Sequence, residues 1–177
     1  MPNLRNVCGV ASDGTYTYFK AYSNATGQDG LYKMDANHAV TRIGDINGYP
    51  RDANVFNGQY FWYDDDSSNL FVTNAAGVQT KLTGNGPDGI NNESVRQIKA
   101  IGSKLYFMAR DDATSNYNIY SIDMANPSAP FASYLTDPSN DWKTRPSNLT
   151  VSGTKLYFTR IPKDGTEGSK VYSIDST

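Results

Sequence analysis

The feature that most constrains this chain is a repeated motif in which a glycine precedes a pair of aromatic residues by a short gap. The second aromatic residues of successive copies stand 43, 45 and 51 residues apart in the 177-residue chain. The four copies are Gly14 with Tyr18-Phe19, Gly58 with Phe61-Trp62, Gly102 with Tyr106-Phe107, and Gly153 with Tyr157-Phe158. Because self-similarity at a period of roughly 20–50 residues is the signature of repeat architectures, one structural unit is expected four times.

A second motif follows each copy after a polar stretch. It reads aliphatic, aromatic, polar, apolar or Thr, and then Asp or Asn, at residues 31–35, 70–74, 119–123 and 171–175. This alternation predicts a half-buried strand. The closing residues Asp35, Asn74, Asp123 and Asp175 recur by symmetry, so we interpret them as turn caps that bond nearby backbone amides rather than as a glycosidase acid pair.

Two further segments complete each unit. Small or aliphatic residues precede each glycine, and a third motif follows the second in all copies but the last; these segments are 7–10, 53–56, 98–101 and 149–151, and 40–43, 78–82 and 132–135. Each repeat therefore predicts four antiparallel strands, A to D, which is the dimension of a β-propeller blade. We expect an all-β fold, with one propeller domain over 1–177, approximate blades 5–46, 47–89, 90–140 and 141–177, and no outer strand in the last blade.

The pattern is clearest in residues 102–123 and 153–175, where Leu-Tyr-Phe is followed by Ile-Tyr-Ser-Ile-Asp or Val-Tyr-Ser-Ile-Asp. It resembles the YWTD and TolB-like propellers, and most closely the bacterial modules related to the low-density-lipoprotein-receptor type, although no copy carries a full YWTD tetrad. The resemblance covers nearly the whole chain. It implies the blade fold and favours an extracellular or cell-surface location, but it does not imply one function.

Relatives of this kind usually close with six or more blades, and an open arc leaves strand edges that invite aggregation. We therefore expect a homo-oligomer, with a dimer favoured because symmetric dimers are the commonest oligomers, or further blades of a longer chain. A closed four-bladed monomer is the alternative.

Composition excludes several classes of function. The formal net charge is -2 and the 16 basic residues are scattered singly, so no basic stripe is available for nucleic acid. Cys8 is the only cysteine and His38 the only histidine. One of each cannot form an intrachain disulfide or a Cys/His zinc site, and no spacing suggests a hydrolase triad. No apolar run is long enough for membrane insertion, no signal peptide pattern opens the chain, and we expect no cofactor.

Loop lengths indicate where a partner would bind. In a four-stranded meander the A–B and C–D turns share one end of the sheet, and the B–C and D–A connections share the other. The connections at the second end are long and variable, at 23–30, 44–52, 84–93, 111–118, 137–146 and 162–170. Because function concentrates on variable loops held by a rigid scaffold, we predict partner binding there. Tyr49, Arg51, Trp142 and Arg145 are the candidate residues, since exposed aromatic residues and Arg are enriched at interface hot spots. The alternative is that Tyr49 and Trp142 pack between blades.

Two short motifs invite a ligand-binding interpretation that the sequence does not favour. Residues 64–69, Asp-Asp-Asp-Ser-Ser-Asn, supply oxygen ligands at alternate positions, but they lack the glycine and the final carboxylate of a calcium loop, so a solvated hairpin is expected. Residues 84–89 spell a dinucleotide fingerprint, but Pro87 interrupts it and no helix pattern follows to hold a pyrophosphate, so a turn cluster is expected.

Two functional hypotheses follow. The favoured one is a non-enzymatic binding or assembly module that presents its long loops to a protein or a glycan. The alternative is a propeller-type glycan hydrolase or lyase in which aspartates converge at the channel mouth. Aspartates gathered in one pocket with raised pKa values would favour the enzyme, because a catalytic acid must hold its proton near the working pH.

Overall fold

The described part of this computed structural model consists of residues 3–83, 95–110, 117–129, 132–134, 146–161 and 168–176. These residues form strands and turns, and none of them belongs to a helix that could cross a membrane. The chain divides into two compact units, Met1–Leu82 and Thr83–Thr177. That residues 1–177 act as a single propeller domain stays a prediction.

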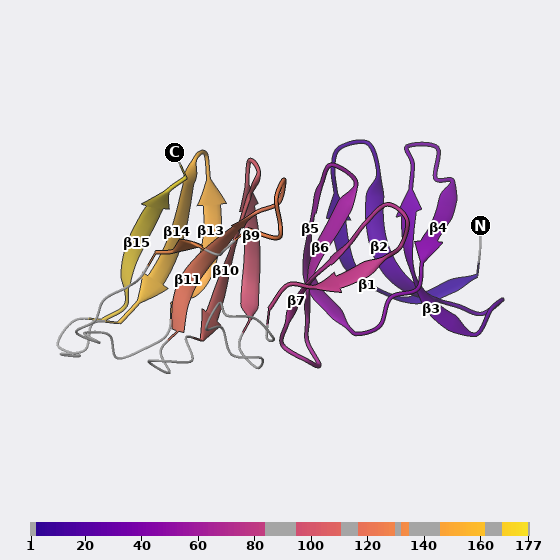
Figure 1. Ribbon diagram of the computed structural model, residues 1–177, viewed down its shortest axis with the longest axis horizontal. Helices are drawn as coiled ribbons and strands as arrows, with labels where there is room; N and C mark the ends of the chain where they lie inside the picture. Colours follow the sequence, from indigo (N-terminus) through magenta and orange to yellow (C-terminus); the bar gives the residue numbers. More distant parts are fainter. Residues whose placement is uncertain are drawn as a thin grey trace. The chain divides into compact units, whose positions relative to one another are not determined.

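Four separate sheets account for the strands of the described residues (Figure 1). The first unit contains sheet 1, with β1 (Leu4–Ser12), β2 (Thr17–Ser23), β3 (Gln28–Met34) and β4 (Val40–Gly44), and sheet 2, with β5 (Pro50–Phe56), β6 (Gln59–Asp64), β7 (Leu70–Thr73) and β8 (Gln79–Lys81). The second unit contains sheet 3, with β9 (Arg96–Ile101), β10 (Lys104–Arg110), β11 (Tyr117–Asp123) and β12 (Ala132–Ser133), and sheet 4, with β13 (Ser147–Ser152), β14 (Lys155–Arg160) and β15 (Lys170–Asp175).

Each sheet is an antiparallel meander in which the strands lie side by side in sequence order. This confirms the predicted four-stranded unit. Within the described residues sheet 4 has three strands, as expected for a last blade without its outer strand. The fold is therefore all-β and propeller-like, since consecutive four-stranded meanders are the building blocks of propellers.

A stacked pair of aromatic rings joins the second and third strands of every sheet. We call these the cross-strand pairs; they are Phe19–Tyr32, Trp62–Phe71, Phe107–Tyr120 and Phe158–Tyr172. The two residues of each pair are direct register partners, and their ring centroids lie 6.0, 4.7, 5.9 and 5.6 Å apart, in that order. The pairs unite the two sequence motifs, because each takes one ring from the glycine-aromatic motif and one from the second motif.

Alternation along these strands sends neighbouring aromatic residues to opposite faces of a sheet, so both faces pack. In the first unit Tyr18 and Leu31 of sheet 1 share a buried cluster with Tyr60 and Trp62 of sheet 2. In the second unit one cluster joins Tyr106 and Ile119 of sheet 3 to Leu149, Leu156 and Phe158 of sheet 4. The core of each unit thus lies between two meanders, as between adjacent blades.

The predicted turn caps are confirmed in three of the four repeats. The Asp35 side chain accepts hydrogen bonds from the amides of Asn37 and Ala39, at 2.9 Å each. Asn74 accepts from Ala76 and Val78 at 3.0 Å each, and Asp123 accepts from Ala125 at 3.0 Å. Asp175 instead lies 3.8 Å from Lys155. The side chains of Asp35, Asn74 and Asp123 thus satisfy turn amides and hold their hairpins closed.

The first strands of the two sheets in the first unit, β1 and β5, approach each other closely. The buried Tyr60 hydroxyl donates a hydrogen bond to the Gly9 carbonyl. A Cβ on Gly9 would lie 2.4 Å from the Pro50 side chain, a distance that real Cβ atoms do not reach. Glycine is therefore required at this crossing. Burial raises the pKa of Tyr60 far above its ordinary value, so the hydroxyl stays protonated as this hydrogen bond requires.

Replacing the Trp62 ring tests the cross-strand pairs. Trp62 is fully buried, stacks on Phe71 and donates an indole hydrogen bond to Thr73 at 3.1 Å. We expect Trp62→Ala to lower the free energy of unfolding by about 3–5 kcal/mol, because it opens a large cavity. Urea unfolding followed by circular dichroism measures the loss. The control is Val78→Ala, at a side chain 58% exposed, with an expected change within about 0.5 kcal/mol. Equal effects of both changes would contradict the packing described.

Candidate functional site

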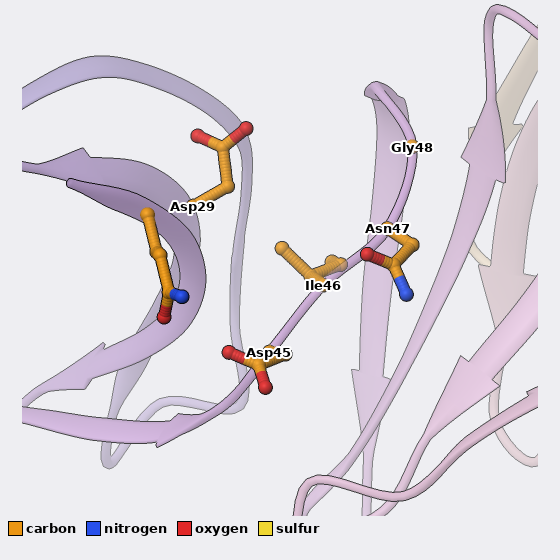
Figure 2. Close-up of a pocket in the computed structure, with 6 residues that line it drawn as sticks. Asp29, Asp45, Ile46, Asn47 and Gly48 are labelled. Carbon is orange, nitrogen blue, oxygen red and sulfur yellow. The ribbon is translucent and has the colours of Figure 1, made fainter. Parts of the chain in front are cut away.

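The loop at 45–49, between β4 and β5, forms most of an open pocket in the first unit. The pocket has a volume of about 480 Å³ and is lined by Gln28, Asp29, Asp45, Ile46, Asn47 and Gly48. Figure 2 shows Asp29 on one side and Asp45, Ile46 and Asn47 along the loop on the other. Both segments belong to the end of the sheets for which partner binding is predicted. The B–C connection of sheet 1 is shorter than predicted, because β2 ends at Ser23 and β3 begins at Gln28.

The Lys20 side chain contacts residues on both sides of this pocket. Its ammonium donates to the Gly48 carbonyl at 2.8 Å, pairs with Asp29 at 3.1 Å and lies 4.4 Å from the centre of the Tyr49 ring. The Lys20 side chain is only 5% exposed. A buried ammonium is tolerated when it is paired and hydrogen-bonded, and these three partners meet that condition.

Asp64, at the end of β6, holds the loop from sheet 2. This buried carboxylate accepts hydrogen bonds from the Tyr49 amide at 2.5 Å, the Ser67 amide at 2.9 Å and the Ser67 hydroxyl. The Asp65 amide donates to the Tyr49 carbonyl at 2.9 Å, so both backbone groups of Tyr49 bond to sheet 2. Gln79 adds two hydrogen bonds to the backbone of Asn47, at 3.3 and 3.2 Å. The loop is therefore anchored by side chains from two sheets.

Within the calcium-like run at 64–69, Asp64 is the side chain that anchors the loop at 45–49. Asp65 and Asp66 are exposed, as a solvated hairpin requires, but Asp64 and Asn69 are each only 3% exposed, which corrects that prediction for the first and last residues of the run. The Asp64 oxygens face amides and a hydroxyl of the protein itself. Among the residues that the structure describes, no group of three or more His, Cys, Asp or Glu residues is placed to hold a metal ion.

Two of the four predicted partner-binding residues lie at this site. The Tyr49 side chain is 49% exposed beside the pocket, and its ring meets Lys20. Arg51 is exposed and pairs with Asp65 at 2.7 Å, but it lies in β5 and not in a loop, because β5 begins at Pro50. Trp142 and Arg145 lie outside the described residues, as do residues 84–89 of the fingerprint motif. A partner-binding role for the four residues stays a prediction.

Sequence reasoning missed Lys20, Gly48 and Asp64, which position the loop. One signal was available for Lys20, since a lysine within the otherwise apolar strand Tyr18 to Tyr22 needs a polar partner when that strand is buried. Nothing in the sequence identifies that partner as the loop at 45–49. Gly48 and Asp64 are 16 residues apart and meet only through packing of the connections.

Cys8 and His38, the single cysteine and the single histidine of the chain, do not form a catalytic group in the described part of the chain. Burial raises the pKa of the half-buried Cys8 thiol, which disfavours the nucleophilic thiolate. His38 lies in the exposed C–D turn of sheet 1, at the end of the sheet opposite to the pocket, with a positive φ of 62°.

A change at Gly48 tests whether the loop position depends on the contact with Asp64. Gly48 has a φ of +118°, and an added Cβ would lie 2.7 Å from a carboxylate oxygen of Asp64. We expect Gly48→Ala to lower the free energy of unfolding by about 3 kcal/mol, from strain and overlap together. We also expect hydrogen exchange at the Tyr49 amide to be faster in this variant.

The matched control is Gly14→Ala. Gly14 has a φ of +89° but no atom within 4 Å of its added Cβ, so it carries the strain without the overlap. Its expected loss is about 1 kcal/mol. Losses of the same size at both positions, with unchanged exchange at Tyr49, would show that Asp64 does not hold the loop.

No protein-family model and no curated protein sequence matches this chain. Among solved structures, the chain is similar to the N-terminal domain of Nup159, with 12% identity, a TM-score of 0.52, and coverage of 99% of this chain and 45% of that one. It is also similar to a chain from an analysis of two prolyl endopeptidases, with 11% identity, a TM-score of 0.52, and coverage of 91% and 25%. A chain of the nidogen/laminin complex matches with 14% identity, a TM-score of 0.45, and coverage of 96% and 75%. At such identities a likeness concerns the fold alone, and the chain spans less than half of the first two structures.

Proposed function

We propose that this protein is a non-enzymatic binding module that presents the loop at 45–49 and its neighbours to a protein or a glycan. The observation that carries the proposal is the anchoring of this loop by Lys20, Asp64 and Gln79 beside an open pocket. A loop that is already fixed loses little conformational freedom when a ligand binds, which favours affinity. The exposed Tyr49 ring and the Arg51 side chain supply the residue types that dominate interface energetics.

Variants at the two ends of the sheets test this proposal. The probe is an array of immobilised neutral and charged oligosaccharides together with extracellular-matrix peptides. We expect Tyr49→Ala and Arg51→Ala to weaken binding about tenfold or more, because each removes a central contact. Asn37→Ala, in the exposed C–D turn of sheet 1, should leave binding unchanged. Binding that depends on Asn37 and not on Tyr49 or Arg51 would contradict the proposal, as would an absence of binding to every probe.

One observation supports the enzymatic alternative, a glycan hydrolase or lyase. Two carboxylates, Asp29 and Asp45, line the same pocket. Asp29 is paired with Lys20 and Asp45 with Arg42, so each is already engaged by a cation. Incubation with the oligosaccharides that bind, followed by chromatography of the products, distinguishes the enzyme from the binding module. Cleavage products that form with the unaltered chain and not with Asp45→Asn would favour the enzyme over the binding module.

We also propose that the chain belongs to the YWTD or TolB-like propellers and that its ring is completed by a second copy. Support comes from the repeated glycine-aromatic motif with its cross-strand pairs. Two four-bladed arcs would make eight blades, and terminal repeats need covering.

Light scattering coupled to size exclusion tests this assembly. We expect a dimer of the 19.5 kDa chain, with a mass that does not fall on moderate dilution. A monomer at all concentrations would contradict completion by a second copy while leaving the binding proposal intact.

A further inference from the structure

We propose that the pocket at 45–49 takes an uncharged sugar unit of a glycan, with hydroxyl groups as the recognised feature. This inference rests on the proposed binding function and specifies the ligand for it. Three features of the site are the basis for it. The lining carries two carboxylates and two side-chain amides, an aromatic ring adjoins it, and each carboxylate is paired with a cation.

The charges of the pocket are compensated within the protein. Asp29 pairs with the buried ammonium of Lys20 at 3.1 Å, and Asp45 pairs with Arg42, whose guanidinium pKa this hydrogen bond raises. Each of the two lining carboxylates is therefore already paired with a cation of the protein, and neither needs an ionic ligand to neutralise it. A cationic ligand would have to compete with Lys20 and Arg42, and an anionic ligand would meet the carboxylates first.

Both carboxylates still offer acceptor sites to a ligand. Their side chains are 42% exposed at Asp29 and 73% exposed at Asp45, and an ionised carboxylate can accept about four hydrogen bonds. Gln28 and Asn47 are exposed on the same lining and carry both amide donors and carbonyl acceptors. A lining that accepts and donates at several points matches hydroxyl groups, which do both.

The Tyr49 ring adjoins the pocket lining and offers an exposed apolar surface next to it. It follows Gly48 directly, is 49% exposed and has the Lys20 ammonium 4.4 Å from its centre. A sugar ring is polar at its edge and carries C–H bonds on its faces, so it can pack against an aromatic ring while its hydroxyls reach polar side chains. Ile46 is 3% exposed and belongs to the buried cluster, so it joins the pocket to the core.

The size and the rigidity of the site fit such a ligand. A volume of about 480 Å³ falls within the range of roughly 300–1,000 Å³ typical of small-molecule sites. The backbone of Asn47 is bonded twice to Gln79, and the backbone of Tyr49 is bonded to Asp64 and Asp65. The polar side chains are thus presented from a fixed backbone, which lowers the entropy lost on binding.

Calorimetry with defined oligosaccharides tests the inference on the full chain. The neutral probes are hexamers of glucose, mannose, xylose and N-acetylglucosamine, and the charged probes are hexamers of galacturonic acid and glucosamine. We expect a neutral hexamer to bind more tightly than either charged one. Asn47→Ala and Asp45→Ala should each weaken that binding about tenfold, the loss expected for one or two hydrogen bonds.

Two controls separate a lost contact from a damaged fold. Asp66→Ala removes an exposed carboxylate from the turn after β6, outside the pocket lining, and should leave binding unchanged. Melting temperatures of all variants should stay close to that of the unaltered chain, because the Asn47 backbone bonds and the Lys20–Asp29 pair remain.

Each outcome has a defined meaning. Neutral binding that is lost in the two pocket variants and kept in Asp66→Ala supports the inference. A preference for a charged hexamer, or neutral binding that is indifferent to Asn47 and Asp45, overturns it. Array binding to peptides alone, weakened by Tyr49→Ala, also overturns the sugar inference but leaves the proposed binding module standing.

Discussion

The stacked ring pair between the second and third strands is the interaction on which the rest of this structure depends. It recurs in all four sheets with the same register, so each meander is held together by two large side chains that face the same way. Directly opposed aromatic residues stabilise a sheet by roughly 0.2–1 kcal/mol beyond smaller pairs, and the buried area of the rings adds more. The same motif also supplies packing between the two sheets of a unit, because the buried clusters that join these sheets include Tyr18, Trp62, Tyr106 and Phe158.

Rigidity at the pocket follows from this packing. Lys20 stands next to Phe19 of a cross-strand pair, and Asp64 lies two residues beyond Trp62 of another. Two of the three side chains that anchor the loop at 45–49, Lys20 and Asp64, therefore extend from strands that carry a cross-strand pair. The loop itself is short and polar and gains its order from these neighbours. Such a division between a packed scaffold and an anchored loop is the usual arrangement of binding sites on β folds.

Much of the fold could be predicted because its determinants are local in sequence. The spacing of glycine, aromatic pair and terminal Asp or Asn predicted the strand order, the hairpin caps at Asp35, Asn74 and Asp123, and the three-stranded last sheet. Boundaries were less accurate: Arg51 was assigned to a loop and lies in β5, and the connection after β2 is shorter than expected. Polar residues such as Arg51 and Gln28 carry no strand signal of their own, and only pairing with a neighbouring strand reveals their state.

By itself the sequence determined the repeating unit, its four-strand order and its aromatic interior, and it led to the prediction of a partner-binding end of the sheets. All of these follow from a period and an alternation that a single chain displays directly. Only the tertiary structure decided that Asp29 and Asp45 share one pocket, that Lys20 joins Asp29 to Gly48, and that Asp64 is an anchor rather than a solvated acid. These contacts join residues of different strands and connections, and their distances are set by how the sheets of a unit pack, which no local pattern encodes.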